Sequence, residues 1–357
     1  MPGQVFRIHS LYAGHGDCLW IEYGDAESPH RVVVDCGTAG TYAALKKVID
    51  SVQGMPGQNE LLVITHVDAD HIAGALPLLA DPKNAKLFKD VWFNGRSHLE
   101  PSGGLEPFGA AQGESLSRSL LDNGLPWNSA YGFRSISLEE DGRPKRLNLP
   151  GGAVVTILSP SWAKLRAMKY KWDSEVKAAG LDSIADAPEP QPIPPGFEAF
   201  GFDVDALADF AFDEDGAEAN GSSIALLLEY GGKSMLLGAD AHPSVLVGAL
   251  QQIAGEAGLT VDLLKVPHHG SQRNTSKALL DVVRCKVALF SSNGAYYRHP
   301  DKEAVARVIK YSPPGVHLAF NCRTKFNEMW DADELRNDWS YSTTYGVGEE
   351  GVSVHLL

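Results

Sequence analysis

Short runs of apolar, β-branched side chains alternate with glycine-containing connections along the first 65 residues of this 357-residue chain. Four runs have the length and period of strands, and one segment has apolar positions at the spacing of a helix. The strands are expected at 5–11, 14–24, 30–38 and 59–66, and the helix at 41–52. This order of strands and helix predicts an α/β fold.

The same alternation returns after residue 220. Two apolar strands flank Gly231 and Gly232 within 222–240, which predicts a hairpin. Amphipathic helical segments then alternate with apolar runs that end in polar residues. We expect helices at 242–258, 276–285 and 301–312, strands at 261–271 and 286–300, and closing strands at 315–321 and 351–357.

Two stretches break the pattern. Residues 96–135 are rich in glycine and serine, and residues 175–219 are first proline-rich and then strongly acidic. We therefore expect a single domain over 1–357 with insertions at about 96–150 and 161–219. The acidic stretch is interpreted as a solvated surface excursion made of loops and short helix, and a lid over an active site is the alternative.

Side chains that bind metals gather at the ends of the expected strands. The sequence THVDADHIAG follows the apolar run 61–64 and supplies His66, Asp68, Asp70 and His71. Three later strands end at Asp240, at the pair His268 and His269, and at His299. Ligands of α/β folds collect at the edge where strand ends converge. Imidazole nitrogen and carboxylate oxygen suit Zn²⁺, Mn²⁺ or Fe without any thiolate, so the pattern predicts a pair of divalent cations.

The motifs together resemble the metallo-β-lactamase superfamily, and within it the nuclease-like domain of ComEC competence proteins. The resemblance rests on GHGDCLWIEYG, VVVDCG, THVDADHIAG, NGSSIALLLEYGGKSMLLGADA, LLKVPHHGS and NGAYYRHP, in this order. It covers roughly residues 5–95 and 150–357 and implies a four-layer αββα sandwich. The channel helices of full ComEC proteins are not seen in the sequence, so DNA uptake does not carry over.

The resemblance also implies a role for each motif residue. His66 and Asp68 would bind a first metal, Asp70 and His71 a second, and Asp240 would bridge both. His269 would complete the first site, and His299 would complete the second. His268 would contact the substrate phosphate or support a metal ligand. Asp35 would orient the metal loop. Spacing alone does not rank His268 against His269, and Asp68 is alternatively a supporting acid or a helix N-cap.

These roles imply hydrolysis of a phosphodiester, in DNA or RNA, by a hydroxide that two Zn²⁺ or Mn²⁺ ions activate. Asp70 or a nearby histidine would transfer the proton, and His268 would lie at the phosphate. Asp68 in place of a histidine favours a harder metal and points away from antibiotic hydrolysis. The alternatives are hydrolysis of a small ester, lactone or thioester, and a non-catalytic binding module that the metals stabilise.

Composition narrows these alternatives. The formal net charge of −14 disfavours loose binding to nucleic acid. No apolar stretch approaches the ~18 residues that span a membrane, and the first residues do not resemble a signal peptide, so a cytoplasmic location is expected. Beside the motifs, Arg273 and Arg298 are candidates for holding a phosphate, whereas Tyr296 and Tyr297 are expected to pack rather than to stack on bases.

Overall fold

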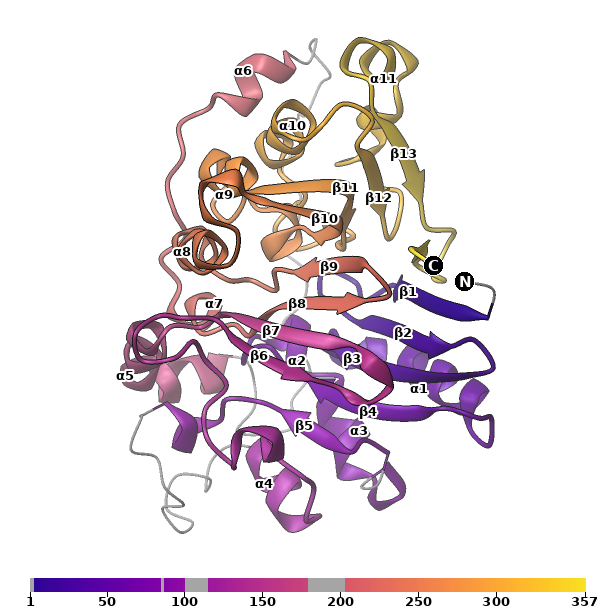
Figure 1. The fold of residues 1–357 in the computed structure, drawn as a ribbon, viewed down its shortest axis with the longest axis vertical. Helices are drawn as coiled ribbons and strands as arrows, with labels where there is room; N and C mark the ends of the chain where they lie inside the picture. Colours follow the sequence, from indigo (N-terminus) through magenta and orange to yellow (C-terminus); the bar gives the residue numbers. More distant parts are fainter. Residues whose placement is uncertain (1–2, 85–86, 100–114, 179–202) are drawn as a thin grey trace.

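The computed structural model describes residues 3–84, 87–99, 115–178 and 203–357. Two β-sheets lie face to face in it, and helices cover the outer face of each (Figure 1). The strand order is β14-β1-β2-β3-β4-β5 in the first sheet and β13-β12-β11-β10-β9-β8-β7-β6 in the second. The predicted αββα sandwich is therefore confirmed.

The first sheet is built from the N-terminal strands and closed by the last strand of the chain. Its strands are β1 (Gln4–Ser10), β2 (Leu19–Asp25), β3 (Ser28–Val34), β4 (Gln58–Val63), β5 (Asp90–Trp92) and β14 (Val352–His355). Helices α1 (Tyr42–Val52), α2 (Ala69–Ile72), α3 (Ala75–Ala80), α4 (Ser115–Asp122) and α5 (Trp162–Ala178) bury apolar side chains in one core cluster with this sheet. The predicted strands and the helix of the first 65 residues are all present.

The second sheet holds the remaining strands, β6 (Lys145–Asn148), β7 (Val154–Ser159), β8 (Ala225–Tyr230), β9 (Lys233–Leu237), β10 (Leu259–Lys265), β11 (Val283–Phe290), β12 (His317–Phe320) and β13 (Ser342–Tyr345). Its outer core cluster includes side chains of α6 (Val204–Ala208), α8 (Pro243–Ala254), α9 (Lys277–Val282) and α10 (Lys302–Tyr311). The short helices α7 (Glu218–Gly221) and α11 (Asp333–Trp339) complete the set. The predicted hairpin is the antiparallel pair β8 and β9.

Side-chain alternation explains why both faces of the first sheet are apolar. Val33 and Leu62 point to the helices, whereas Val32, Val34 and Leu61 join the cluster between the two sheets. Successive side chains of a strand point to opposite faces, so a central strand with helices on one side and a sheet on the other must be apolar at every position. This double burial makes the runs at 30–38 and 59–66 continuous rather than alternating.

One expectation about the elements was wrong. The helix expected at 276–285 ends at Val282, because from Val283 the chain forms β11 in parallel with β10. Residues 162–178, the first part of the expected insertion at about 161–219, form the helix α5. Its Leu165, Met168 and Trp172 are buried in the core of the first sheet, so α5 belongs to the sandwich. The rest of the proline-rich stretch, residues 179–202, lies outside the described residues. Within the described part of the chain, no helix has the length and apolarity to cross a membrane.

A buried ion pair joins the loop before β2 to the end of β10. The Lys265 ammonium lies 2.7 Å from the Asp17 carboxylate, and both side chains are almost completely buried. Burial by itself would raise the pKa of Asp17, but Lys265, His269 and His71 together outweigh burial and hold this pKa far below its usual range. The pair therefore ties together two sheets that share no hydrogen-bonded strand.

We predict that Lys265→Ala lowers the free energy of unfolding by about 3–5 kcal/mol, because it leaves Asp17 buried without its counter-charge. Urea unfolding in the presence of a chelator measures this loss without a contribution from bound metal. Lys277→Ala is the matched control, because Lys277 lies at the same 2.7 Å from Asp281 but in an exposed pair. It should cost less than about 1 kcal/mol. Equal losses in the two variants would contradict a structural role for the buried pair.

Candidate metal centre

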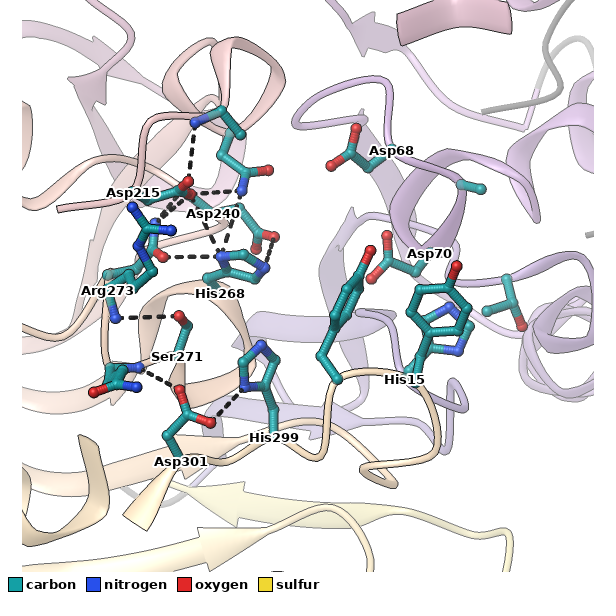
Figure 2. A pocket seen from close by; sticks show the side chains of 18 residues that line it. His15, Asp68, Asp70, Asp215, Asp240, His268, Ser271, Arg273, His299 and Asp301 are labelled. Carbon is teal, nitrogen blue, oxygen red and sulfur yellow. Dashed lines mark hydrogen bonds and ion pairs between the residues drawn. The ribbon is translucent and has the colours of Figure 1, made fainter. Parts of the chain in front are cut away.

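The ends of β3, β4, β9, β10 and β11 open into one pocket between the two sheets. Its volume is about 640 Å³, within the range of roughly 300–1,000 Å³ typical of small-molecule sites. Figure 2 shows Asp68, Asp70 and His15 on one side of this pocket and Asp215, Asp240, His268 and Arg273 on the other. Residues that lie far apart in the chain therefore meet at the strand ends, as the sequence predicted.

A single buried carboxylate organises the loop that follows β4. Asp35 accepts hydrogen bonds of 2.8 Å each from the backbone N–H of Thr65, from the Thr65 hydroxyl and from Nδ1 of His71. Because a carboxylate only accepts, Nδ1 of His71 carries the proton. Nε2 of His71 is then unprotonated in the neutral ring and directs its lone pair toward the pocket. The structure thus places Asp35 where the resemblance implied it.

The same carboxylate fixes His66 through Thr65. The Thr65 hydroxyl uses its one proton in the bond to Asp35, so at 2.9 Å it accepts the proton of His66 Nδ1. Nε2 of His66 is consequently an acceptor. It is buried, and it has no hydrogen-bond partner among the described residues. A buried polar atom without a partner is costly, so this nitrogen requires a ligand.

His269 presents its lone pair in the same way. Its Nδ1 lies 2.8 Å from the carbonyl oxygen of Ser291, which only accepts, so Nε2 is again unprotonated in the neutral ring. That Nε2 lies 3.2 Å from Nε2 of His71. Two nitrogen lone pairs that face each other at this distance repel unless a cation or a proton lies between them.

His268 completes the set of oriented imidazoles. Its Nδ1 lies 2.9 Å from the side-chain oxygen of Asn274. The amide nitrogen of Asn274 donates to Asp215 and to the backbone oxygen of Asp240, at 3.1 Å each, which turns the amide oxygen to His268. Nδ1 of His268 therefore donates. Its Nε2 faces Oδ2 of Asp240 at a distance of 3.6 Å.

Four residues form what we call the inner cluster: Asp70, His71, Asp240 and His269. The Nε2 of His269 lies 3.3 Å from Asp70 and 3.8 Å from Asp240, and the Nε2 of His71 lies 3.9 and 3.4 Å from the same carboxylates. Ligands at 2.0–2.1 Å from a tetrahedral ion are about 3.3–3.4 Å from one another. The inner cluster therefore fits one such cation.

A second group, the outer cluster, consists of His66, Asp68, Asp240 and His268. Nε2 of His66 lies 3.5 Å from Asp68 and 3.9 Å from Oδ2 of Asp240. Oδ1 of Asp240 lies 3.4 Å from Nε2 of His71, and its Oδ2 lies 3.6 to 3.9 Å from Nε2 of His66, His268 and His269, so this carboxylate is shared by the two clusters. Its Oδ1 is also buried without a hydrogen bond among the described residues, which fits a bridging ligand.

Proton affinities show the pull of these carboxylates on positive charge. Burial alone would lower the pKa of His71 and of His269. Asp240 and Asp35 outweigh it and raise the pKa of His71 well above its ordinary value, and Asp17 and Asp240 raise that of His269 to about 10. The imidazoles in turn outweigh burial at Asp240 and hold its pKa well below the usual range. The pocket therefore attracts cations.

Two predicted residues differ in placement from the sequence-based expectation. His269 lies with Asp70 and His71 rather than with His66, and His268 takes its place in the outer cluster. Both residues have left-handed backbone conformations, with φ of +55° and +47°, and their rings lie at 74° to each other, which separates their directions. No regular strand or helix would place adjacent side chains in this way.

His299 lies beside His268 of the outer cluster, with ring centroids 5.3 Å apart. Its Nδ1 lies 3.3 Å from Asp301, and its other ring nitrogen faces the pocket (Figure 2). Asp68 does stand at the N-cap position of α2, but its side chain accepts no bond from that helix. The N-cap alternative is therefore wrong for the Asp68 carboxylate, which faces His66 instead.

The sequence analysis did not identify Asp215, an acidic residue that lines the pocket. Asp215 accepts from the backbone N–H of Ala217 at 2.9 Å and from the amides of Asn220 and Asn274 at 2.6 and 3.1 Å, and it lies 3.6 Å from Nδ1 of His268. Asp215 therefore supports His268. The described part of the acidic stretch is not only a solvated excursion. No spacing in that acidic run distinguishes Asp215 from its neighbours.

A glycine contact explains the GHGD motif. The backbone oxygen of Asp70 accepts from the N–H of Asp17 at 3.2 Å, and a Cβ atom on Gly16 would lie only 1.7 Å from that oxygen. The loop can approach the metal loop so closely only with glycine at this position. The motif thus holds the backbone of Asp70 in place.

We predict that Asp35→Asn lowers the affinity for Zn²⁺ or Mn²⁺ by about 10–100-fold, because it changes the proton pattern that orients His66 and His71. Asparagine tolerates the backbone φ of +59° at this position. Competition with a chromogenic chelator measures the affinity. Asp90→Asn is the matched control. Asp90 is also a buried aspartate, and it accepts four hydrogen bonds, from Val91, Trp92, Ser129 and Ala130, none of which belongs to the metal clusters. Equal losses in both variants would contradict the role of Asp35.

Comparisons with known proteins agree with this geometry. Residues 12–94 match the family model of the Metallo-beta-lactamase superfamily, a match that implies a metal-dependent hydrolase. Recombination protein 2 of Haemophilus influenzae is 29% identical over 139 residues, which are 37% of this chain and 17% of that protein. The match thus spans less than a fifth of the relative.

Two solved structures are similar over nearly their whole length. The metallo-beta-lactamase fold protein YhfI from Bacillus subtilis has a TM-score of 0.38 at 12% identity, and the alignment covers 98% of this chain and 99% of that one. Zn²⁺-bound PqqB from Methylobacterium extorquens has a TM-score of 0.44 at 10% identity, with the same coverage.

Proposed function

We propose that this protein, whose residues 12–94 match the metallo-β-lactamase superfamily, is a metal-dependent phosphodiesterase that acts on nucleic-acid-type phosphodiesters. The observation that carries the proposal is the convergence of imidazole Nε2 atoms with the carboxylates of Asp70 and Asp240 in one pocket. Fixed hydrogen bonds at Nδ1 turn these lone pairs inward. Lone pairs and carboxylates that converge in this way favour the binding of cations.

The two clusters would hold one divalent cation each. Asp70, His71 and His269 would bind the inner ion, His66, Asp68 and His268 would bind the outer ion, and Asp240 would contact both. The outer set has as many carboxylate oxygens as imidazole nitrogens, which favours Mn²⁺ over a three-histidine zinc site. When bound, a pair of such ions lowers the pKa of a water molecule and stabilises negative charge on a phosphoryl group.

The residues of the chain supply orientation and proton handling. Asp35, Thr65 and Ser291 hold the ligand imidazoles in one tautomer, so the site needs little rearrangement when it is loaded. His299 faces the pocket with one ring nitrogen while the other lies beside Asp301. We assign to it the proton of the leaving alcohol, the role that sequence reasoning gave to Asp70 or a nearby histidine, because Asp70 lies within the inner cluster.

Two considerations bear on the substrate. The name Recombination protein 2 concerns nucleic acid, and the motifs resemble those of ComEC-type proteins, so both favour a nucleic-acid phosphodiester. The net charge of −14 and the carboxylate of Asp215 in the pocket lining both disfavour binding of a long polyanion. We therefore expect short or single-stranded substrates to be cleaved faster than long duplexes.

Hydrolysis of bis(p-nitrophenyl) phosphate in Mn²⁺ or Zn²⁺ tests the proposal. Asp240→Asn should reduce kcat/KM by at least about 100-fold, because the neutral amide removes the negative charge and replaces one of the two oxygens by an NH2 group, which does not bind a cation. Asp262→Asn is the matched control, since Asp262 is a buried aspartate of β10 whose partners are Lys233, Lys286 and the N–H of Ser234 outside the pocket. It should keep the rate of the unmodified protein.

A panel of substrates decides between the reaction classes. The protein should cleave the phosphodiester and a short oligonucleotide, and EDTA should abolish both activities. Turnover of a lactone or thioester without phosphodiester cleavage would replace the proposal by the small-molecule alternative. Stoichiometric metal without hydrolysis of any substrate would support a binding module instead.

A further inference from the structure

An exposed aromatic ring stands inside the pocket that holds the metal clusters. The side chain of Tyr297 lines this pocket, and the residue is 58% exposed. Among the described large apolar residues that are exposed, it is the one in the pocket lining. The expectation that Tyr296 and Tyr297 both pack is therefore wrong for Tyr297.

Tyr297 rests on a rigid aromatic base. Its ring meets that of Tyr296 edge-on, with centroids 4.5 Å apart at 78°, and Tyr296 stacks on His15 at 5.3 Å and 23°. His15 belongs to the glycine loop of the first sheet, and the N–H of Asn293 donates to the Gly14 oxygen of that loop at 2.8 Å. Tyr296 thus packs as expected, and its ring supports one edge of the contact with the Tyr297 ring.

The ring is close enough to the clusters to contact a group attached to a bound phosphodiester. Its centroid lies 5.9 Å from that of His299, whose ring centroid is in turn 5.3 Å from that of His268 in the outer cluster. A nucleotide links its base to its phosphate through one sugar, so a base beside a phosphate at the clusters can reach a ring one side chain away from them.

The charges in the pocket lining favour a contact between the substrate and an uncharged ring. Of the described residues in its lining, Arg273 alone has a permanently cationic side chain, and its guanidinium is already paired with Asp213 at 3.0 Å and with the Glu214 oxygen at 3.1 Å. Asp215 and Asp301 line the pocket as well. Flanking phosphates therefore gain little from charge, and binding energy must come from an uncharged part of the substrate.

We propose that Tyr297 is a stacking platform for a nucleobase next to the scissile phosphate, so that it selects nucleoside phosphodiesters over simple alkyl ones. This inference rests on the proposed phosphodiesterase function and names its substrate class. A tyrosine ring can stack on any of the bases, because every base has a π face. Tyr297 thus determines specificity without a part in the bond-breaking step.

Two esters with the same leaving group test the platform. Thymidine 5′-(p-nitrophenyl) phosphate carries a base, and methyl p-nitrophenyl phosphate carries none. We expect the unmodified protein to prefer the thymidine ester in kcat/KM by about 5- to 150-fold, the range that one stacked base supplies. Tyr297→Ala should bring this ratio close to one, mainly through KM, and leave the rate on the methyl ester unchanged.

Two further variants separate stacking from other effects. Tyr297→Phe keeps the ring and should keep the preference, whereas Tyr297→Leu keeps apolar bulk without a π face and should lose it. A parallel loss on both esters in Tyr297→Ala would show a structural role only and overturn the platform. The same holds if Tyr297→Leu retains the full preference.

The outcomes also distinguish the two proposals. If the unmodified protein cleaves neither ester in Mn²⁺ or Zn²⁺, the phosphodiesterase function fails and the platform fails with it. If it cleaves both esters and Tyr297→Ala leaves the ratio unchanged, the platform alone is overturned and the phosphodiesterase function stands.

Discussion

Three hydrogen bonds to Asp35 set the orientation of two imidazoles of the centre, those of His66 and His71. This buried carboxylate accepts from the backbone and hydroxyl of Thr65 and from Nδ1 of His71, at 2.8 Å each. Because it only accepts, it sets the proton positions of these two rings, one directly and one through Thr65. Both Nε2 lone pairs then face inward, and a cation is their natural partner, above all for Nε2 of His66, which is buried without a hydrogen bond among the described residues.

The remaining constraints bring the second half of the centre to the first. Asp240, His268 and His269 come from the second sheet, and the buried pair of Asp17 and Lys265 joins their strand ends to the first sheet. Residues with positive φ gather here, among them Asp35, Ala239, His268 and His269. Such backbone conformations persist only where surrounding contacts determine them, and they recur at functional sites. Rigid strands set the distances, and these few residues set the directions.

Much of this arrangement could be predicted from the sequence. The apolar runs and the helical periods gave most elements, since a strand buried on both faces has to be apolar throughout. The histidines and aspartates at strand ends predicted the position of the pocket, because parallel strands bring their ends to one edge of the sheet. The match to the superfamily over residues 12–94 agrees with both.

The parts that could not be predicted depend on features without a pattern in the chain. The directions of His268 and His269 follow from two left-handed residues, which spacing does not reveal. Asp215 acts through amides of Asn220 and Asn274, and only the fold brings these three together. The end of α9 at Val282 follows from pairing of β11 with β10, so tertiary contacts overrode a helical period.

The metal content of the protein tests the central claim most directly. After equilibration with Mn²⁺ or Zn²⁺ and removal of free ions, inductively coupled plasma mass spectrometry gives the ions bound per chain. Two clusters that share Asp240 predict about two equivalents, with a second, weaker step of binding. A folded protein that retains no divalent ion from either solution would contradict this account.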